Sequence, residues 1–376
     1  MKEAPHIVMV AGEDSGDYHG ANLALALRQS SPGIRLSGIG GVKMEAAGVE
    51  LIFPSSRLAV IGITEVLGCL ADINAGRKAI RSHLRESHPD LVVLIDFPGF
   101  NLHLVAPFAA KLQIPIVYYI SPKVWAWRRG RIAAIKRLID KMLVILPFEE
   151  EFFQQHDVTV EYVGHPLLDE FNSFPTLDRS NNPNIALIPG SRKGEIKRLL
   201  PEMLTAARLY SRERPEVRFL IPVAPSITFA SIESLIPTSF RHRITLLRQP
   251  LAAVLREVSF ALVTSGTATL ETALAEIPMV VVYKVNQLSY EIGKRVVKVP
   301  FFSLVNLIAE KEIVPELLQS QAVPEIITGH MRALLDNKSN YRRTVKELKA
   351  LKSRLGKPGA PQRAAAAIIS ELRKNE

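Results

Sequence analysis

Residues 261–284 are Ala-Leu-Val-Thr-Ser-Gly-Thr-Ala-Thr-Leu-Glu-Thr-Ala-Leu-Ala-Glu-Ile-Pro-Met-Val-Val-Val-Tyr-Lys, and this stretch decides the fold. The apolar run at 260–263 predicts a buried strand, and an amphipathic helix is expected over about 268–275. Pro278 stops that helix, and the apolar run at 279–282 predicts a second buried strand. The stretch therefore predicts one strand–helix–strand unit of a parallel α/β sheet.

The turn Ser265-Gly266-Thr267 lies at the start of the predicted helix, where backbone N–H groups lack partners within the helix. Such a helix end attracts anions, and phosphate above all. Glu271 follows one turn later, where its carboxylate can accept hydrogen bonds from sugar hydroxyls. The alternative interpretation is that Ser265 and Thr267 only cap the helix.

Length and charge limit the classes of function. A chain of 376 residues, 47% of them hydrophobic, is long enough for two domains with sizeable cores. Lys and Arg exceed Asp and Glu by 47 to 37, which gives a net charge of +10 and suggests an anionic partner. Acidic lipid and phosphorylated small molecules fit this charge; no RNA- or DNA-binding motif accompanies the basic residues, so we expect no nucleic-acid partner.

Cysteine usage and hydropathy favour a cytosolic protein. The only cysteine, Cys69, excludes an intramolecular disulfide, and its apolar helical surroundings indicate a packing role. The apolar run at 7–11 is too short for a signal peptide and leads into a turn rich in Gly and acidic residues. No stretch of about 18 uncharged apolar residues exists, so we expect a soluble or peripheral protein.

The first half opens with a predicted strand at 6–11, a turn at 12–17 and a helix at 18–29. The turn lacks the spacing of the dinucleotide fingerprint, and its three carboxylates would repel a pyrophosphate. We therefore expect this turn to face a sugar or the cleft between the domains. Its candidate acceptor residues are Glu13, Ser15 and Asp17.

Residues 57–76 are unusually apolar for a connection. A core helix is one interpretation; the other is a surface helix that enters a membrane or contacts acyl chains. Four basic residues follow closely in the sequence, which suits the membrane interpretation. The predicted acyl-contact residues are Leu58, Ile61, Ile63, Val66, Leu67 and Leu70, and the basic residues are Arg77, Lys78, Arg81 and Arg85.

Asp96 directly follows the predicted strand 91–95. In open parallel sheets, ligands bind at this end of the strands. A lone carboxylate with no Cys or His set nearby suits a general base better than a metal ligand. The alternative is an N-cap for the helix that starts near Asn101.

A second candidate segment follows the predicted strand 116–120. Ser121, Trp125 and Arg128 lie in it, where aromatic rings and arginines could bind a base or a phosphosugar. The alternative is a structural corner beneath the basic helix expected at 130–138. The strand 142–146 and the helix 148–156 come next, and His165 is interpreted mainly as a structural residue.

A polar segment rich in Pro, Asn and Ser at 171–183 predicts a linker. The α/β plan then restarts with a strand at 185–188, a turn at 189–195 and a helix at 196–210. In this turn a glycine, a helix start and two cations coincide, which favours anion binding. The further predictions are strands at 218–223 and 244–246, a basic helix at 288–299, a final helix at 363–374, and the candidate donor-binding residues Gly190, Ser191, Arg192 and Asn306.

Together these patterns predict an α/β fold with two Rossmann-like domains facing a cleft. The two turns of the second half would clamp one diphosphate, with Glu271 on a ribose, while Asp96 of the first half would face an acceptor hydroxyl. This is an arrangement for glycosyl transfer. No Asp-x-Asp pair accompanies a suitable strand end, so Arg192 and helix N-termini would have to stabilise the leaving group.

Eight motifs, in order over nearly the whole chain, resemble the lipid-A-disaccharide synthases. One departure is Asp14, where that family usually has a small residue. The motifs of the first half are Gly12-Glu13-Asp14-Ser15-Gly16-Asp17, Ile95-Asp96-Phe97-Pro98-Gly99-Phe100-Asn101, Tyr119-Ile120-Ser121-Pro122-Lys123-Val124-Trp125-Ala126-Trp127, Leu146-Pro147-Phe148-Glu149 and Val163-Gly164-His165-Pro166. Those of the second half are Pro189-Gly190-Ser191-Arg192, Ser265-Gly266-Thr267-Ala268-Thr269-Leu270-Glu271 and Leu304-Val305-Asn306-Leu307.

The resemblance implies a GT-B fold and an inverting transfer that needs no metal or other cofactor. The donor would be UDP-2,3-diacylglucosamine and the acceptor 2,3-diacylglucosamine 1-phosphate, giving a β-1,6-linked lipid A disaccharide 1-phosphate and UDP. Asp96 would be the base for the acceptor 6-hydroxyl, and Arg192 would bind the donor phosphate. The resemblance also implies a peripheral position on anionic lipid at the cytoplasmic face of the inner membrane in a Gram-negative-type envelope.

The expected domains are an acceptor-binding domain at 1–170, the linker, a donor-binding domain at 184–350 and a helical tail at 351–376. Since family members form dimers, a homodimer is expected, with the tail on the N-terminal domain of its own or a partner chain. The alternatives are another GT-B enzyme that uses a UDP-sugar, such as the peptidoglycan glucosaminyltransferase or a 2-epimerase, or a non-catalytic nucleotide-sugar sensor.

Overall fold

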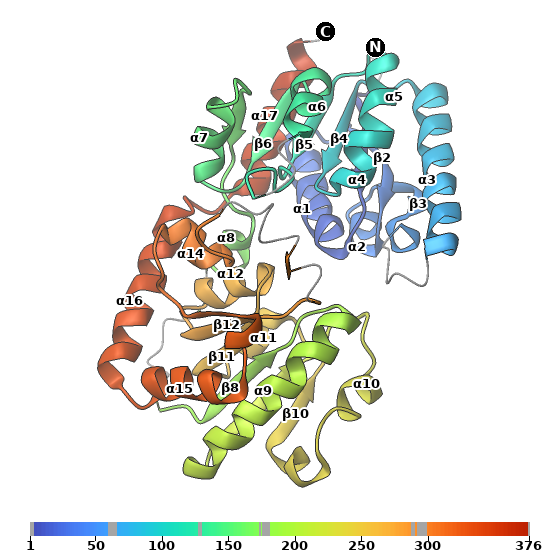
Figure 1. Ribbon diagram of the computed structural model, residues 1–376. Coiled ribbons are helices and arrows are strands. Elements are labelled where there is room, and N and C mark those ends of the chain that lie inside the picture. The colour runs from blue at the N-terminus through green and yellow to red at the C-terminus, as the bar shows by residue number, and fades with distance from the viewer. Residues whose placement is uncertain are drawn as a thin grey trace. The chain divides into compact units, whose positions relative to one another are not determined.

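A computed structural model describes residues 4–58, 66–126, 130–172, 174, 181–286, 290–291 and 299–374; for 66–69 it describes the backbone alone. The chain divides into two compact units. Unit 1 comprises Met1–Pro166 and Lys357–Glu376, and unit 2 comprises Leu167–Gly356. Each unit is built around one parallel sheet with helices on both faces (Figure 1).

The sheet of unit 1 is parallel throughout its described strands. Its strand order is β3 (Glu50–Pro54), β2 (Arg35–Gly40), β1 (His6–Ala11), β4 (Leu91–Ile95), β5 (Ile116–Tyr119), β6 (Lys141–Val144) and β7 (Val160–Tyr162). Every residue of β1, β4 and β5 is buried, as expected for strands covered on both faces.

Helices cover both faces of this sheet. The helix α1 (Asp14–Ser30) packs against α17 (Ala360–Lys374), so the C-terminal segment belongs to unit 1. The opposite face carries α3 (Val66–Ser87), α5 (Ala106–Lys111) and α6 (Arg131–Leu138), whose apolar residues share one core with Val8, Val10 and Val92. Shorter elements are α2 (Val42–Ala46), α4 (Pro98–Phe100), the π-helical turn Asn101–Val105 and α7 (Phe148–Gln154).

Unit 2 repeats the plan. Its strand order is β10 (Ile244–Leu247), β9 (Arg218–Pro222), β8 (Asn184–Ile188), β11 (Phe260–Thr264), β12 (Met279–Tyr283) and β13 (Glu316–Leu318). Its described helices are α8 (Leu167–Glu170), α9 (Lys193–Glu213), α10 (Phe229–Glu233), α11 (Leu251–Leu255), α12 (Thr267–Leu274), α14 (Leu304–Ala309), α15 (Pro324–Leu335) and α16 (Lys338–Arg354).

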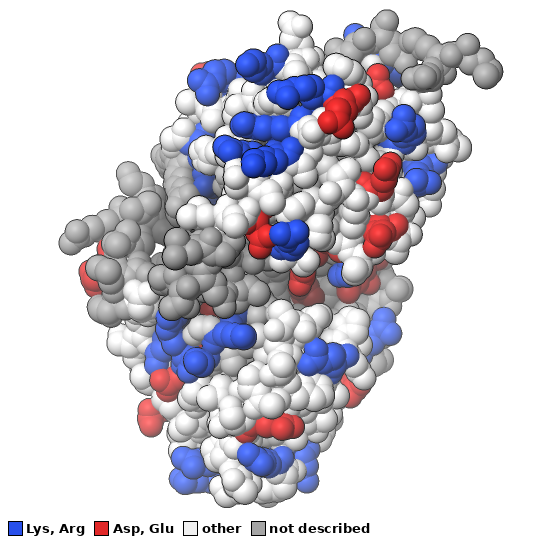
Figure 2. All heavy atoms as spheres, turned by 90° about the vertical axis from the view of Figure 1, so that its right-hand side faces the viewer, with Lys and Arg blue, Asp and Glu red and all other residues white. Residues whose placement is uncertain are grey.

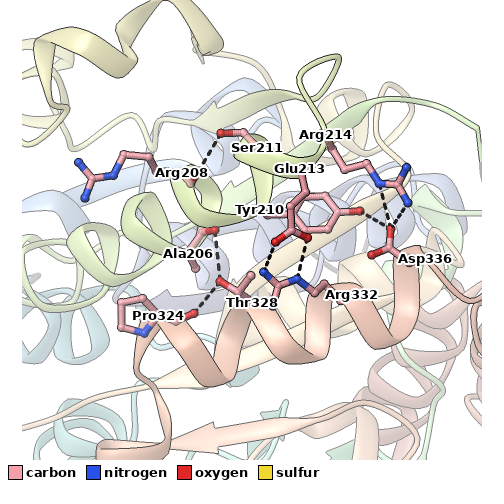
Figure 3. A network of polar contacts seen from close by, with 10 residues as sticks. All are labelled: Ala206, Arg208, Tyr210, Ser211, Glu213, Arg214, Pro324, Thr328, Arg332 and Asp336. Carbon is pink, nitrogen blue, oxygen red and sulfur yellow. Dashed lines mark hydrogen bonds and ion pairs between the residues drawn. The ribbon is translucent and has the colours of Figure 1, made fainter.

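The helices α9 and α15 of unit 2 lie side by side and are joined by polar contacts (Figure 3). Arg332 of α15 donates to Glu213 of α9, and the Thr328 hydroxyl donates to the Pro324 carbonyl oxygen within α15. Both helices also bury apolar residues in one core with β8. The polar contacts therefore lie at the edge of an apolar core to which both α9 and α15 contribute.

Both sheets have a point at which the strand order reverses. In unit 1 this point lies between β1 and β4, where Ala11 pairs with Ile95. In unit 2 it lies between β8 and β11, where Ile188 pairs with Val263. Parallel α/β sheets bind ligands in the crevice beyond the strands at such a point. The fold therefore indicates that the loops after these four strands are the candidate ligand-binding loops.

The predicted α/β elements are confirmed, with shifts at their ends. The stretch at 261–284 forms β11, α12 and β12 as expected. The first helix begins at Asp14 rather than at residue 18, and the short strands β3, β7 and β13 were not predicted. Within 57–76 a helix is described only from Val66, and most of the predicted basic helix at 288–299 lies outside the described residues.

Candidate functional site

Asp96 lies directly after β4, beside the loop that follows β1. Its backbone has a positive φ of 44°, and the next residue, Phe97, has a φ of 48°. Left-handed backbone at two consecutive non-glycine residues is strained and is maintained only by surrounding contacts. The Asp96 carbonyl oxygen accepts hydrogen bonds from the Asn101 side chain at 2.8 Å and the Tyr118 hydroxyl at 2.5 Å. These two buried side chains therefore hold the strained turn.

Gly12, at the end of β1, makes room for this turn. A Cβ atom at Gly12 would lie 2.1 Å from the Phe97 ring, so no larger residue fits there. The ring packs instead against the glycine backbone. Gly12 and Phe97 therefore pack closely against each other.

The environment raises the pKa of Asp96 to about 6. Burial is the largest cause, and the negative charge of Glu13 adds to it. Lys123 and a hydrogen bond from the Phe97 N–H act in the opposite direction. A carboxylate with this pKa is largely ionised near neutral pH and more basic than an ordinary aspartate, as a general base requires.

Glu13 and Ser15, the candidate acceptor residues of the first loop, are exposed. Asp17 is buried, and its contact with the acceptor stays a prediction. Its carboxylate is 5% exposed and accepts hydrogen bonds from the backbone N–H groups of Gly41, Lys43 and Met44. Asp17 therefore caps the short helix α2, a structural role.

Ser121 and Trp125 are also buried, at 5% and 7% exposure. The Ser121 hydroxyl and the Trp125 indole N–H both donate to one oxygen of Glu149, at 2.5 and 3.2 Å. These contacts favour the structural corner, the alternative interpretation of this segment. Contact of the two side chains with the acceptor stays a prediction. Lys123 lies between them in sequence and is exposed. Arg128 lies outside the described residues.

In unit 2, Gly190 begins the turn after β8. Its φ is +97°, and a Cβ atom there would lie 2.7 Å from a carboxylate oxygen of Glu195, so both conformation and space require glycine. Ser191 and Arg192 follow and are exposed. Arg192 forms an ion pair with Glu195 at 3.1 Å, but its side chain remains 75% exposed and can reach an anionic ligand.

The neighbouring loop after β11 carries Ser265, Gly266 and Thr267 at the start of α12. The Ser265 hydroxyl donates to the Phe302 carbonyl oxygen at 3.0 Å, while Thr267 is exposed. The preceding Thr264 hydroxyl is buried and has no hydrogen-bond partner among the described residues. The Thr264 methyl group lies 3.6 Å from the Cβ position of Gly190, so the two turns are adjacent.

Glu271 is half-buried one turn into α12. Burial, and to a smaller extent the charge of Glu170, raises its pKa to about 7. Its carboxyl group therefore titrates near neutral pH. Hydrogen bonds from a ribose diol would stabilise its ionised form.

Asn306 is completely buried, and its contact with the donor stays a prediction. Its amide donates to Val314 and Glu316, and its carbonyl oxygen accepts from the N–H groups of Ile313 and Val314. Glu316 in turn accepts from the backbone N–H of Phe302. Asn306 and Glu316 therefore shape the loop that contacts Ser265.

Of the predicted acyl-contact residues, Leu58 is only 1% exposed and packs in the core of unit 1. Leu70 is 56% exposed on α3. Ile61 and Ile63 lie outside the described residues, as do the side chains of Val66 and Leu67. Within the described part of the chain, none of the helices combines the length and the apolar character needed to cross a membrane.

The described residues contain no cluster of three or more His, Cys, Asp or Glu side chains arranged to hold a metal ion. Sequence reasoning missed Glu149, Glu316 and Lys123 as site residues. Glu149 occurs in one of the quoted motifs, and Lys123 in another. Their roles depend on contacts between separate loops, which no local pattern reveals.

Comparison with known proteins agrees with this fold. The model of the family described as lipid-A-disaccharide synthetase matches residues 7–368. The lipid-A-disaccharide synthase of Syntrophus aciditrophicus (strain SB) is 43% identical, with 98% of each chain covered. That of Myxococcus xanthus (strain DK1622) is 41% identical, with 99% of each covered.

Solved structures with the same fold are more distant in sequence. Acinetobacter baumannii MurG has a TM-score of 0.60 at 16% identity, covering 97% of this chain and 99% of that one. A putative UDP-N-acetylglucosamine 2-epimerase from Listeria monocytogenes has a TM-score of 0.65 at 13% identity, covering 99% and 98%. These likenesses show the GT-B fold alone, whereas the family match is specific. The chain therefore belongs to the lipid-A-disaccharide synthase family, glycosyltransferases of lipid A biosynthesis.

Proposed function

We propose that the chain condenses UDP-2,3-diacylglucosamine with 2,3-diacylglucosamine 1-phosphate, with inversion at the anomeric carbon. The products would be a β-1,6-linked lipid A disaccharide 1-phosphate and UDP. Family membership supports a UDP-sugar-type donor and a lipid acceptor. The observation that carries the proposal within this chain is Asp96, a partly buried carboxylate at the strand reversal with a pKa of about 6.

In the proposed reaction, the Asp96 carboxylate accepts the proton of the acceptor 6-hydroxyl as that oxygen attacks the anomeric carbon of the donor. The bond between this carbon and the UDP oxygen breaks on the opposite face, which inverts the configuration. The strained turn at Asp96 supports this role, because Asn101 and Tyr118 fix its backbone before any substrate binds.

UDP leaves with additional negative charge on its terminal phosphate. In our proposal Arg192 and the N–H groups at the start of α12 stabilise that charge. The 75% exposure of the Arg192 side chain supports direct contact with the phosphate. Asn306 would act indirectly, by shaping the loop that contacts Ser265.

The variant Asp96→Asn tests the assignment of the base. It should reduce kcat by roughly 10²–10⁴-fold, the usual contribution of general base catalysis. UDP binding by isothermal titration calorimetry should remain normal, because the donor residues belong to unit 2. Near-normal turnover of a folded Asp96→Asn protein would remove Asp96 from this role.

We also propose that the enzyme acts at the surface of an anionic membrane. Figure 2 shows Lys and Arg side chains gathered on the face of unit 1 seen there. On α3, Arg81 and Arg85 both stack on the Phe108 ring, at 5.0 and 5.5 Å. Leu70 on the same helix is an exposed apolar side chain. Basic residues and an exposed apolar residue on one helix suit a surface rich in anionic lipid.

Flotation with liposomes tests this membrane proposal. The variant Leu70→Gln combined with Arg85→Gln should float less with vesicles containing phosphatidylglycerol, and added salt should weaken binding of the unaltered protein. The matched control is Leu25→Gln, at another exposed leucine of unit 1. Equal flotation of all three proteins would refute this part of the proposal.

We further propose a homodimer as the working form, by analogy with the family. The helix α17 packs on α1 within the chain described here. Sedimentation of the purified protein, with and without detergent, tests this proposal. A monomer at concentrations at which the enzyme is active would contradict it.

A further inference from the structure

Glu149 is an ionisable group that the reaction as proposed does not use. It lies at the start of α7, is 1% exposed, and accepts four hydrogen bonds. One carboxylate oxygen accepts from Ser121 and Trp125, and the other from the N–H groups of Ile145 and Leu146 at 3.2 and 2.9 Å. Every one of these groups donates to it.

Four donors match the acceptor capacity of an ionised carboxylate. Burial raises the pKa of Glu149, whereas all four hydrogen bonds lower it. A protonated carboxyl group would place its own hydrogen against one of these donors. The contacts therefore fit the carboxylate form.

The four hydrogen bonds connect the loops after two neighbouring strands. Ser121 and Trp125 follow β5, while Ile145 and Leu146 follow β6. The next strand on the other side of β5 is β4, which ends at Ile95, directly before Asp96. The loop that Glu149 holds is therefore adjacent to the turn of the proposed base.

This loop departs from regular structure in several places. Ile120 has a positive φ of 67°, and the N–H of Val124 donates to the Pro122 carbonyl oxygen at 2.5 Å. The Trp125 ring is also held edge-on against Phe148, with 5.0 Å between ring centroids. Exposed Lys123 lies between the two residues that Glu149 anchors.

We propose that Glu149 is a positioning residue: its buried carboxylate anchors both ends of the Ser121–Trp125 loop and thereby keeps the Lys123 ammonium facing Asp96. This inference rests on the proposed role of Asp96. A buried apolar side chain could fill the same space without the cost of desolvating a charge. The carboxylate supplies what such a side chain cannot, namely fixed positions for two loops at once.

The position of Lys123 affects proton binding by Asp96. The groups that face the Asp96 carboxylate are Glu13, Lys123 and Tyr118. Of these, Lys123 favours the ionised form of Asp96. If Glu149 positions Lys123, loss of Glu149 should raise the pKa of Asp96 in the same direction as loss of Lys123 itself.

The experiment measures kcat/KM against pH for Glu149→Gln, Lys123→Gln and the double variant. Glu149→Gln should lower kcat by roughly ten- to a hundredfold through misplacement of the loop. Its acidic limb should move to higher pH, as for Lys123→Gln, and the double variant should show no further shift. The matched control is Glu150→Gln, at the next residue of α7, whose exposed side chain accepts one bond from the Tyr162 N–H.

A second readout does not depend on activity. The chain has two tryptophans, so Trp127→Phe leaves one indole N–H signal, that of Trp125, in a ¹H–¹⁵N spectrum. Glu149→Gln should move this signal, whereas Glu150→Gln should not. If Glu149→Gln does not fold, Ser121→Ala replaces it, since that variant removes one donor and leaves the backbone anchors.

A folded Glu149→Gln or Ser121→Ala protein with an unshifted acidic limb would overturn the proposal. So would a double variant in which the two shifts add. The role of Asp96 is judged separately. A fully active Asp96→Asn protein refutes the base, whereas an inactive one beside a normal Glu149→Gln protein refutes only the positioning role.

Discussion

Glu13 and Asp96 follow neighbouring strands at the strand reversal of unit 1, and the negative charge of Glu13 raises the pKa of Asp96. The two residues lie in adjacent loops, so a neighbouring side chain of the same unit helps to set the pKa of the proposed base. Burial has the larger effect. Glu13 therefore refines a pKa that burial has already raised.

The first prediction concerns the pH dependence of activity. The acidic limb of kcat/KM should lie near pH 6, the pKa of Asp96 in the free protein. Glu13→Gln should move this limb to lower pH, because the like charge is removed while burial remains. A pH–rate profile over this range measures the shift. A limb that stays in place, or moves to higher pH, would contradict the assigned role of Glu13.

The second prediction concerns stability. Because the folded-state pKa of Asp96 exceeds the ordinary 3.8, its contribution to stability is present at low pH and is lost as pH rises through about 6. Above that pH, Asp96→Asn should stabilise unit 1 by roughly 2–3 kcal/mol, from a shift of about two pKa units. Below about pH 4 the two proteins should be equally stable.

Amide hydrogen exchange of β4 and β1 at two pH values measures this difference within unit 1. A variant that is less stable than the unaltered protein at the higher pH would contradict the prediction. A stabilising Asp96→Asn substitution would mean that ionised Asp96 lowers the stability of the folded protein. A base that is costly to ionise when folded is retained for its chemistry rather than for stability.

The third prediction concerns the donor. Glu271 has a pKa of about 7, and ribose hydroxyls would donate to its ionised form. UDP should therefore bind more tightly as pH rises through about 7, with release of a proton from Glu271. Glu271→Gln should lose this part of the pH dependence and keep that of the UDP phosphate itself.

Calorimetry of UDP binding in two buffers with different ionisation enthalpies counts the proton. Glu170→Gln supplies a directional control, because removing its charge should lower the pKa of Glu271. Identical pH dependence in Glu271→Gln and the unaltered protein would exclude Glu271 from the ribose contact.

The strands and the glycine turns after them could be predicted from sequence because their signals are local, whereas the strand order that creates the reversals depends on pairing between distant segments. The apolar run at 260–263 predicts a strand, and the turn at 265–267, a few residues later, predicts the start of a helix. What could not be predicted is where a polar side chain finds its partner. The Asp17 carboxylate accepts hydrogen bonds from Gly41 and Met44, far along the chain, and its position after a strand does not reveal these partners.

Trp125 and Asn306 show the same limit. Each lies in a motif that suggests binding, yet each donates a hydrogen bond to a carboxylate of another element, Glu149 of α7 or Glu316 of β13. Leu58 lies in an apolar run whose period cannot separate a core face from a membrane face. The burial of these side chains depends on the whole fold and could not be predicted from the local sequence.

The fourth prediction concerns the contacts between α9 and α15 in Figure 3. Tyr210 is 3% exposed and donates to Asp336 at 3.1 Å, and burial raises its pKa. The ion pair of Arg332 with Glu213 is about half exposed. Tyr210→Ala should therefore cost roughly 3–5 kcal/mol, whereas Arg332→Gln should cost less than about 1 kcal/mol.

Hydrogen exchange of the α9 amides compares the two variants within unit 2. Tyr210→Phe separates the hydroxyl from the ring, and its cost should be about 1 kcal/mol. An Arg332→Gln cost equal to that of Tyr210→Ala would show that the surface pair, rather than the buried ring, holds these helices together.

The fifth prediction concerns Arg363 of α17, which joins the two chain segments of unit 1, Met1–Pro166 and Lys357–Glu376. Its guanidinium donates to the carbonyl oxygens of Val163 at 2.8 Å, Lys357 at 2.6 Å and Pro358 at 2.8 Å. Gly164 has a φ of +82°, and a Cβ atom there would lie 2.5 Å from this guanidinium. Gly164 therefore leaves the space that the Arg363 guanidinium occupies.

Lysine carries the same charge but cannot reach three carbonyl oxygens in the planar geometry of a guanidinium. Arg363→Lys should therefore destabilise the packing of α17 on α1 by roughly 2 kcal/mol, the scale for loss of hydrogen bonds to a charged group. Exchange of the α17 amides measures this, with Arg373→Lys, at an exposed position of the same helix, as the matched control. Equal protection in the two variants would mean that the apolar contacts between α17 and α1 hold the C-terminal segment without the arginine.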